Sequence, residues 1–360
     1  MKMPTTLSRS RLSQKPMPFK NSRQMANLIL SLLLFIAFSG CQNKADDFFK
    51  QGDAKNSKGD FAGAIDDFNK GLAIDSNNVK CIIGRGVSKS NLKDFKGAIE
   101  DYNLAIQKDT NFAAAYYFKG FAEMMLGDDH QAIQEYSTAI KLEPRSAEYY
   151  RIRASSQDNL RNYDAAIADY TSAIQIDSTK ANFYYERAGS RKDNSDYFGA
   201  LSDYNKTLQL KPGFPLGHLS RGLLYSEIGN TWAAINDFTA EIERGEKKPE
   251  AYFSRGLSLM SVKKYQMAIS DFKKSIDLKA EDDRAYYGLG KASYLLGDYQ
   301  TAKANLEIAA GKNDKNPDAF FFLGLTQFRL NDKKGARQNL KTACDLGMTE
   351  ACDSIRKYYK

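Results

Sequence analysis

Few residues in this 360-residue chain have the side chains and spacing that catalysis or metal binding requires. Its two histidines are His130, which we place in a turn, and His218, which stands at a recurring aromatic position of a helix. The sequence has no His-Glu-x-x-His zinc motif, no Gly-x-Ser-x-Gly nucleophile motif and no Gly-x-x-x-x-Gly-Lys phosphate loop. Acidic residues recur at fixed intervals, so no carboxylate pair for acid–base chemistry can be singled out. We therefore expect no catalytic residue, no metal site and no cofactor.

The four cysteines have different settings along the chain. Cys81 falls where a small buried side chain is expected. Cys344 and Cys352 are spaced so that a disulfide could close a short loop across two helices, although two free thiols packed between the helices fit the sequence equally well. Cys41 directly follows an apolar run, and its setting differs from that of the other three.

The apolar run covers Leu28–Phe38 and contains a single polar residue. Eleven residues are too few to span a bilayer, which takes about 20, but they suit the core of an export signal. Lys20 and Arg23 precede the run, and Ser39 and Gly40 separate it from Cys41. The sequence predicts a cleaved signal over residues 1–40.

Residues 38–41, Phe-Ser-Gly-Cys, resemble the lipobox of bacterial lipoproteins, with Phe38 in place of the usual leucine. The resemblance implies acylation of Cys41, with residues 41–44 as a short tether. An ordinary secretory signal with a coincidental cysteine is the alternative. Gln42 is not the aspartate that retains many such proteins at the inner membrane, so the resemblance favours the outer membrane, with the protein facing the periplasm or the outside.

The net charge of +8 is concentrated in the leader. Residues 1–40 hold six of the 52 basic residues and no acidic one, which leaves 46 basic against 44 acidic residues in the rest of the chain. A nearly neutral body lacks the electrostatic footprint of a nucleic-acid-binding protein. We expect no nucleic-acid partner.

The body of the chain is a 34-residue repeat that recurs nine times from residue 45 to residue 350 without an insertion. Position 20 of the repeat is alanine in every copy, position 8 is glycine or alanine, and position 24 is a large apolar residue. The copies begin at Ala45, Val79, Ala113, Ala147, Ala181, Pro215, Pro249, Asp283 and Pro317.

Apolar residues within each copy follow helical spacing in two stretches, separated by a polar turn near position 15. This pattern predicts a pair of helices that approach closely at the small residues and bury their apolar faces against neighbouring copies. It resembles the tetratricopeptide repeat. The resemblance implies an all-α fold, a right-handed superhelical solenoid of nine helix hairpins over residues 45–350, with a capping helix over residues 351–360.

Two charged positions change together along the array. Position 7 is basic in repeats two to seven and leucine in repeats eight and nine, while position 23 is acidic in repeats one to seven and asparagine in the last two. We expect the two positions to form a ladder of ion pairs with a structural role. The sequence leaves open whether each pair lies within one repeat, as Arg153 with Asp169, or joins adjacent repeats, as Asp169 with Arg187.

The resemblance also implies a concave groove formed by the first helix of each repeat, with position 5 facing it. Six of the nine residues at this position are aromatic, which suits binding of a peptide. Rings that simply pack in the repeat are the alternative. The lysine and asparagine pattern of family members that bind acidic chaperone tails is absent. The candidate groove residues are Phe49, Tyr117, Arg151, Tyr185, Phe253, Tyr287 and Phe321.

The sequence thus predicts a non-catalytic scaffold, lipid-anchored in the bacterial envelope, that binds a protein or peptide partner along its groove. Two other functions remain open at this stage. Aromatic grooves also stack sugars, so a glycan- or peptidoglycan-associated binder is one alternative. The other is a regulatory subunit of an envelope enzyme complex, which needs a catalytic partner.

Overall fold

The computed structural model describes residues 44–245 and 247–358, and within these ranges the regular secondary structure is entirely α-helical. The predicted all-α class is therefore confirmed. The predicted signal segment and Cys41 lie outside the described residues, as do residues 246, 359 and 360. No helix in the described ranges has the length and apolar composition to cross a bilayer.

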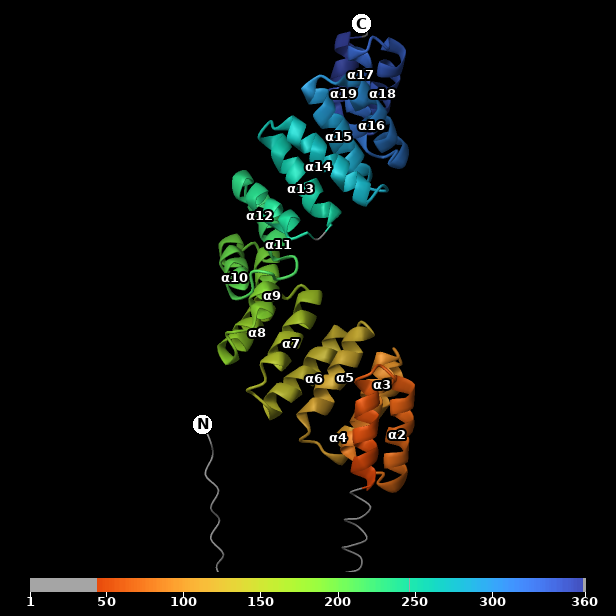
Figure 1. The fold of residues 1–360 in the computed structure, drawn as a ribbon, viewed down its shortest axis with the longest axis vertical. Helices are drawn as coiled ribbons and strands as arrows, with labels where there is room; N and C mark the ends of the chain where they lie inside the picture. The colour runs from red at the N-terminus through yellow and green to blue at the C-terminus, as the bar shows by residue number, and fades with distance from the viewer. Residues whose placement is uncertain (1–43, 246, 359–360) are drawn as a thin grey trace, which may run out of the picture. The chain divides into compact units, whose positions relative to one another are not determined.

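The described residues form two compact units, one up to residue 144 and one from residue 145 on, and each is described by itself (Figure 1). The described part of the first unit contains a helix over residues 44–56 and then α2 (Phe61–Ile74), α3 (Val79–Asn91), α4 (Phe95–Lys108), α5 (Ala113–Met125) and α6 (Asp129–Leu142). The second unit contains α7 (Ala147–Asn159), α8 (Tyr163–Ile176), α9 (Ala181–Asp193), α10 (Tyr197–Leu210), α11 (Gly217–Glu227), α12 (Thr231–Glu243), α13 (Pro249–Ser261), α14 (Tyr265–Leu278), α15 (Asp283–Leu296), α16 (Tyr299–Lys312), α17 (Pro317–Arg329), α18 (Lys333–Asp345) and α19 (Thr349–Tyr358).

The helices follow the repeat, with two helices in each 34-residue copy. The first helix of most copies begins at the residue that opens the copy, for example Val79 in α3 and Pro317 in α17. Repeat six differs, because α11 begins at Gly217 rather than at Pro215. Leu216 precedes α11 with φ of 62°, a left-handed conformation that delays the start of the helix.

The turn between the two helices of a repeat has the same backbone in every copy. The residue at position 15 has positive φ throughout: Gly59, Lys93, Gly127, Arg161, Ser195, Gly229, Lys263, Gly297 and Asn331. In seven of the nine copies the side chain of the following residue caps the second helix, as where the Asp60 carboxylate accepts a hydrogen bond from the Gly63 backbone N–H; Asn162 and Lys264 form no such bond. The left-handed residue reverses the chain, and the cap satisfies a backbone donor that the helix leaves unpaired.

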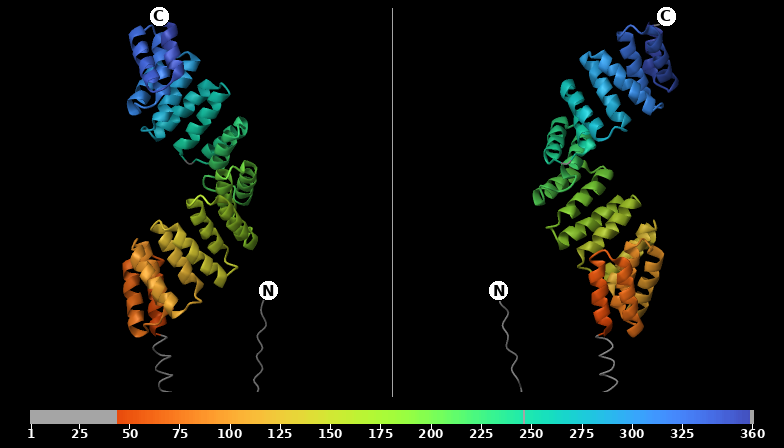
Figure 2. Two further views of the ribbon diagram at one scale, coloured as in Figure 1. Left: turned by 180° about the vertical axis from the view of Figure 1, so that it is seen from behind. Right: turned by 45° about the vertical axis from the view of Figure 1, so that its right-hand side comes forward.

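Small residues at position 8 let the two helices of a repeat meet over the large residue at position 24. A Cβ added to Gly256 would lie 2.8 Å from the ring of Phe272. A Cβ added to Gly288, from the next repeat, would lie 2.7 Å from the same ring. The Phe272 ring therefore packs between helices of two repeats, and the views of Figure 2 show consecutive helices lying side by side within each unit.

The structure shows whether the ion pairs of the ladder lie within one repeat or join adjacent repeats. Within repeats, the basic group at position 7 contacts the carboxylate at position 23 at 2.6–2.9 Å, and the pairs are Arg85–Asp101, Lys119–Glu135, Arg153–Asp169, Arg187–Asp203, Arg221–Asp237 and Arg255–Asp271. The guanidinium also reaches the preceding repeat by a hydrogen bond. Arg255 donates to Thr239 at 3.1 Å, and Arg221 donates to Asn205 at 2.6 Å. The ion pair thus lies within one repeat, while the arginine links that repeat to the one before it.

The C-terminal helix α19 packs on α18, on the side where a following repeat would stack. Ala351 is fully buried against Leu340 and Ala343. A disulfide joins Cys344 of α18 to Cys352 of α19, with 4.9 Å between their Cα atoms. The helix begins two residues before the predicted boundary at residue 351.

Candidate functional site

In repeats one, three, five and seven, the aromatic residue at position 5 contacts the ring at position 24 of the same repeat. Ring centroids are 6.1 Å apart for Tyr117 and Tyr136, and 5.9 Å apart for Phe253 and Phe272. Tyr185 also lies 4.8 Å from the ring of Phe214. Phe49 packs on Phe68, and Tyr287 and Phe321 both pack on Phe322. Much of each ring is therefore committed to the core of the repeat, and only part of it faces solvent.

Arg151 is held by two carboxylates of the same surface. Its guanidinium binds Glu148, one turn earlier on α7, and Glu186 on α9. Burial raises the pKa of Glu186, although the Arg151 charge acts in the opposite direction. Neither carboxylate was predicted, and together they neutralise the only cation among the predicted groove residues.

One predicted residue, Tyr117, lines a cleft in the first unit. The cavity measures about 220 Å³ and lies between the first helices of repeats two and three. Its lining is mostly aromatic and carries no charge: Val87, Ser90, Asn91, Tyr102, Tyr117, Phe118 and Phe121. The Ser90 and Tyr102 hydroxyls are hydrogen-bonded at 3.2 Å, and burial raises the pKa of Tyr102. We refer to this cavity as the aromatic cleft.

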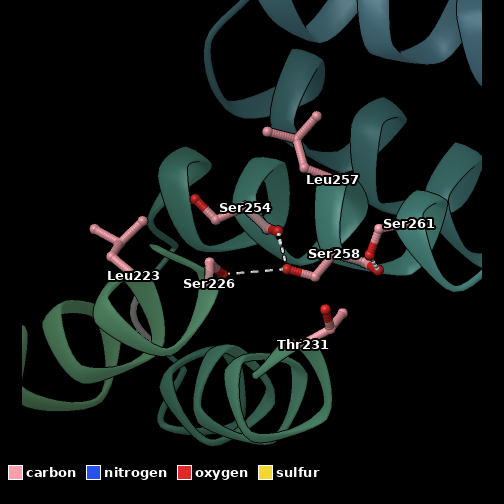
Figure 3. A pocket seen from close by; sticks show the side chains of 7 residues that line it. All are labelled: Leu223, Ser226, Thr231, Ser254, Leu257, Ser258 and Ser261. Atoms are coloured by element: carbon pink, nitrogen blue, oxygen red, sulfur yellow. Dashed lines mark hydrogen bonds between the residues drawn. The ribbon is translucent and has the colours of Figure 1, made fainter. Parts of the chain in front are cut away.

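A second cleft, in repeats six and seven of the second unit, has a different lining (Figure 3). Its cavity of about 290 Å³ is lined by two leucines and five hydroxyl side chains: Leu223, Ser226, Thr231, Ser254, Leu257, Ser258 and Ser261. Figure 3 shows Ser258 linked to Ser226 and to the backbone of Ser254. We refer to this cavity as the leucine–hydroxyl cleft.

The leucine–hydroxyl cleft was not predicted from the sequence, because the predicted groove residues all stand at position 5 and none of the residues that line this cleft does. A signal was nevertheless present at position 17. Six of nine repeats have an aromatic residue there, whereas repeat six has Thr231. A small residue at a position that is usually filled by a ring marks a place where the surface can open.

The described residues hold no group of three or more His, Cys, Asp or Glu side chains that could bind a metal ion. His218 lies in α11, where its Nδ1 is 3.0 Å from the carboxylate of Asp237, which also pairs with Arg221. The placement of His130 in a turn was wrong. It is the second residue of α6, because Asp128 caps that helix one residue before it begins.

Comparison with known proteins identifies relatives by sequence pattern and by fold. Models of the tetratricopeptide repeat family match residues 122–181 and 287–351, and another model of that repeat matches residues 249–282. No curated protein sequence gives a significant match.

Three solved structures match parts of this chain. A tetratricopeptide repeat protein from Parabacteroides merdae is 21% identical, and the alignment covers 68% of this chain and 96% of that one, with a TM-score of 0.50. The C-terminal part of a repeat protein from Cytophaga hutchinsonii is 21% identical over 76% of this chain and 99% of that one, with a TM-score of 0.48. MamA protein is 28% identical over 47% of this chain and 92% of its own, with a TM-score of 0.43.

Proposed function

Because this chain is a tetratricopeptide repeat protein, we propose that it is a non-catalytic scaffold that binds a protein partner through the first helices of its repeats. The aromatic cleft carries this proposal. It presents several rings and no charge, which suits an apolar side chain of a partner segment.

We further propose that the scaffold is anchored by lipid at Cys41 and resides at the outer membrane, facing the periplasm or the outside. The apolar run before Cys41 and the lipobox-like residues 38–41 support this anchoring. Two residues, Gln42 and Asn43, separate the proposed acyl site from the first described helical residue. A tether of that length spans about 10 Å at full extension, so the repeats would be held close to the bilayer.

The partner-binding proposal is tested by replacing Val87 and Phe121 together with aspartate, which places charge in the aromatic cleft. Partners are recovered from detergent-solubilised membranes with the wild type, the double variant and Met125→Asp. Met125 is 50% exposed at the end of α5 and is not part of the cleft lining, so it controls for added charge. We expect the double variant alone to lose the partner while keeping its helical circular dichroism. Unchanged recovery by the double variant would contradict the proposal.

Anchoring is tested separately by Cys41→Ala. The variant should move from the membrane fraction to the soluble fraction of the cell. If it still sediments with membranes after a salt wash, the proposed acylation does not hold the protein there.

A further inference from the structure

Thr231 leaves space in the leucine–hydroxyl cleft that a longer side chain at its position would occupy. In repeat five, the position-17 residue Tyr197 crosses to the next repeat, and its hydroxyl donates to Glu227 at 3.2 Å. The equivalent residues one repeat later are Thr231 and Ser261, and both line the cleft. A tyrosine at residue 231 would extend toward Ser261 and fill this space, so the short threonine leaves it open.

The two leucines of the cleft are not required by the fold. Leu223 and Leu257 stand at position 9 and remain 42% and 45% exposed. Other repeats carry Asp53, Gly189 and Lys291 at this position, which shows that the helix packing tolerates a polar or absent side chain there. Exposed leucines on two adjacent repeats, beside a cavity, favour a surface that another molecule covers.

The hydroxyl groups of the cleft retain hydrogen-bonding capacity. Ser258 donates to the Ser254 carbonyl at 3.0 Å and Ser261 donates to the Ser258 carbonyl at 2.8 Å, so their oxygens can still accept. The hydroxyls of Thr231 and Ser254 form no hydrogen bond with any other described residue. The cleft therefore offers both donors and acceptors to a ligand.

The lining also limits the chemistry of that ligand. It contains no charged residue, which disfavours an anion or a cation, and no aromatic ring on which a sugar could stack. The cavity of about 290 Å³ lies at the lower limit of the roughly 300–1,000 Å³ typical of ligand sites, so it has room for a side chain and the adjoining backbone. Peptide N–H and C=O groups match the hydroxyls, and an aliphatic side chain matches the leucines.

We propose that the leucine–hydroxyl cleft binds an uncharged, extended peptide segment of a partner protein, with a leucine-sized aliphatic side chain in the cavity and the neighbouring backbone bonded to the hydroxyls. This inference rests on the proposed scaffold function and adds the ligand chemistry of a second site. The segment bound here differs from one that fits the aromatic cleft, which offers rings rather than hydroxyls.

The probe is a phage-displayed library of random dodecapeptides, selected against the full chain carrying Cys41→Ala so that the protein is soluble. Selection should enrich peptides with leucine, isoleucine or methionine among uncharged residues. An enriched peptide is then synthesised with a fluorescent label, and its affinity is measured by anisotropy. Trp232, the single tryptophan of the chain, adjoins Thr231, so its emission should change when unlabelled peptide binds.

The deciding variant is Thr231→Tyr, because neighbouring repeats already accept a ring at this position and the fold should tolerate it. We expect at least tenfold weaker binding by Thr231→Tyr and unchanged binding by Thr231→Ser, which keeps the cavity open. Leu223→Asp should also weaken binding, whereas Leu296→Asp, with a similarly exposed leucine outside the cleft, should not.

Several outcomes would overturn the inference. They are enrichment of charged peptides, no enrichment at all, equal affinity of Thr231→Tyr and wild type, or a response of Trp232 to N-acetylglucosamine oligomers instead of peptides. The charge variants in the aromatic cleft provide the separate check on the scaffold function. If the aromatic-cleft variants lose the partner but Thr231→Tyr binds peptide as the wild type does, the leucine–hydroxyl cleft is not a peptide site, and the scaffold proposal still holds.

Discussion

At the scale of single residues, the ion-pair ladder connects buried carboxylates to arginines that also reach the preceding repeat. Asp271 is 5% exposed and depends on Arg255 for its compensating charge. Repeats eight and nine show an alternative without charges. There, Leu289 and Leu323 occupy position 7 and Asn305 and Asn339 occupy position 23, and the Asn305 amide donates to the Thr301 carbonyl at 2.8 Å.

Arg255→Leu should therefore lower the free energy of unfolding by about 3–5 kcal/mol, because it leaves the buried Asp271 carboxylate without its partner. The double variant Arg255→Leu with Asp271→Asn should recover most of this loss, since it reproduces the combination in the last two repeats. Urea unfolding followed by circular dichroism measures both. If the single and double variants are destabilised to a similar extent, the unpaired Asp271 charge is not the cause of the lower free energy of unfolding.

Asp158 is a half-buried carboxylate outside the ladder. It accepts hydrogen bonds from the Ser190 hydroxyl at 2.8 Å and from the Tyr170 hydroxyl at 3.2 Å. Its other oxygen has no partner among the described residues. Burial is the main cause that raises its pKa, and the two hydroxyls oppose this only in part.

A raised pKa means that the folded protein holds the Asp158 proton more tightly than the unfolded chain does. Stability should then fall as pH rises through the ordinary carboxyl pKa to the raised one, and stay lower at neutral pH. Asp158→Asn removes this loss, so it should raise the melting temperature at pH 7 and have little effect near pH 3. Thermal melts at both values measure the difference. An equal effect at the two pH values would exclude ionisation as its cause.

The sequence predicted the features that depend on repetition, and it missed those that depend on geometry between repeats. Period and residue size identified the helix pairs, the close approach at position 8 and the two positions of the ladder. The register of the ladder could not be deduced, because Arg255 contacts Asp271 in its own repeat and Thr239 in the one before. Glu148 and Glu186 were missed as partners of Arg151, because they stand at different repeat positions and meet only when α7 and α9 stack.

At the scale of secondary-structure elements, α19 is the helix that follows the last repeat. It packs on one side against α18, and the ring of Tyr358 lies 4.6 Å from that of Phe328. The disulfide between Cys344 and Cys352 closes a short loop between the two helices. Because a disulfide that closes a loop of this size restricts the unfolded chain, it should stabilise the folded state by about 2–3 kcal/mol.

Reduction of this disulfide should loosen α19 and leave the preceding helices folded. Hydrogen exchange of residues 349–358 should become faster after treatment with dithiothreitol, while exchange in α15 and α16 stays the same. Cys352→Ser should reproduce the effect without reductant. Unchanged exchange in α19 would mean that packing alone holds the helix in place.

At the scale of the whole molecule, each repeat is stabilised by its immediate neighbours within its unit. Phe272 illustrates this, because it is enclosed by Gly256 of its own repeat and Gly288 of the next one. In such a stack, damage at one repeat propagates to adjacent repeats and weakens with distance. Stability is therefore expected to be local.

Gly256→Val should disturb repeats six to eight and leave residues 44–144 unchanged. The added side chain would overlap the Phe272 ring, at a cost of about 1–3 kcal/mol. Gly189→Ala is the matched control, because a Cβ at Gly189 meets no atom within 4 Å and the change should stabilise α9 by about 1 kcal/mol. Hydrogen exchange along the chain measures the extent of the disturbance. Faster exchange throughout the chain would indicate that the molecule unfolds as one cooperative body.

The threonine at residue 231 has a consequence for how this array could acquire new partners. By the proposal above, a short side chain at this position leaves room between two repeats and a ring would fill it, while the other helix pairs keep their own contacts. A binding site between two repeats could thus be gained or lost without changing the sites between other repeats. Single substitutions could therefore change which partners the scaffold binds while its fold stays the same.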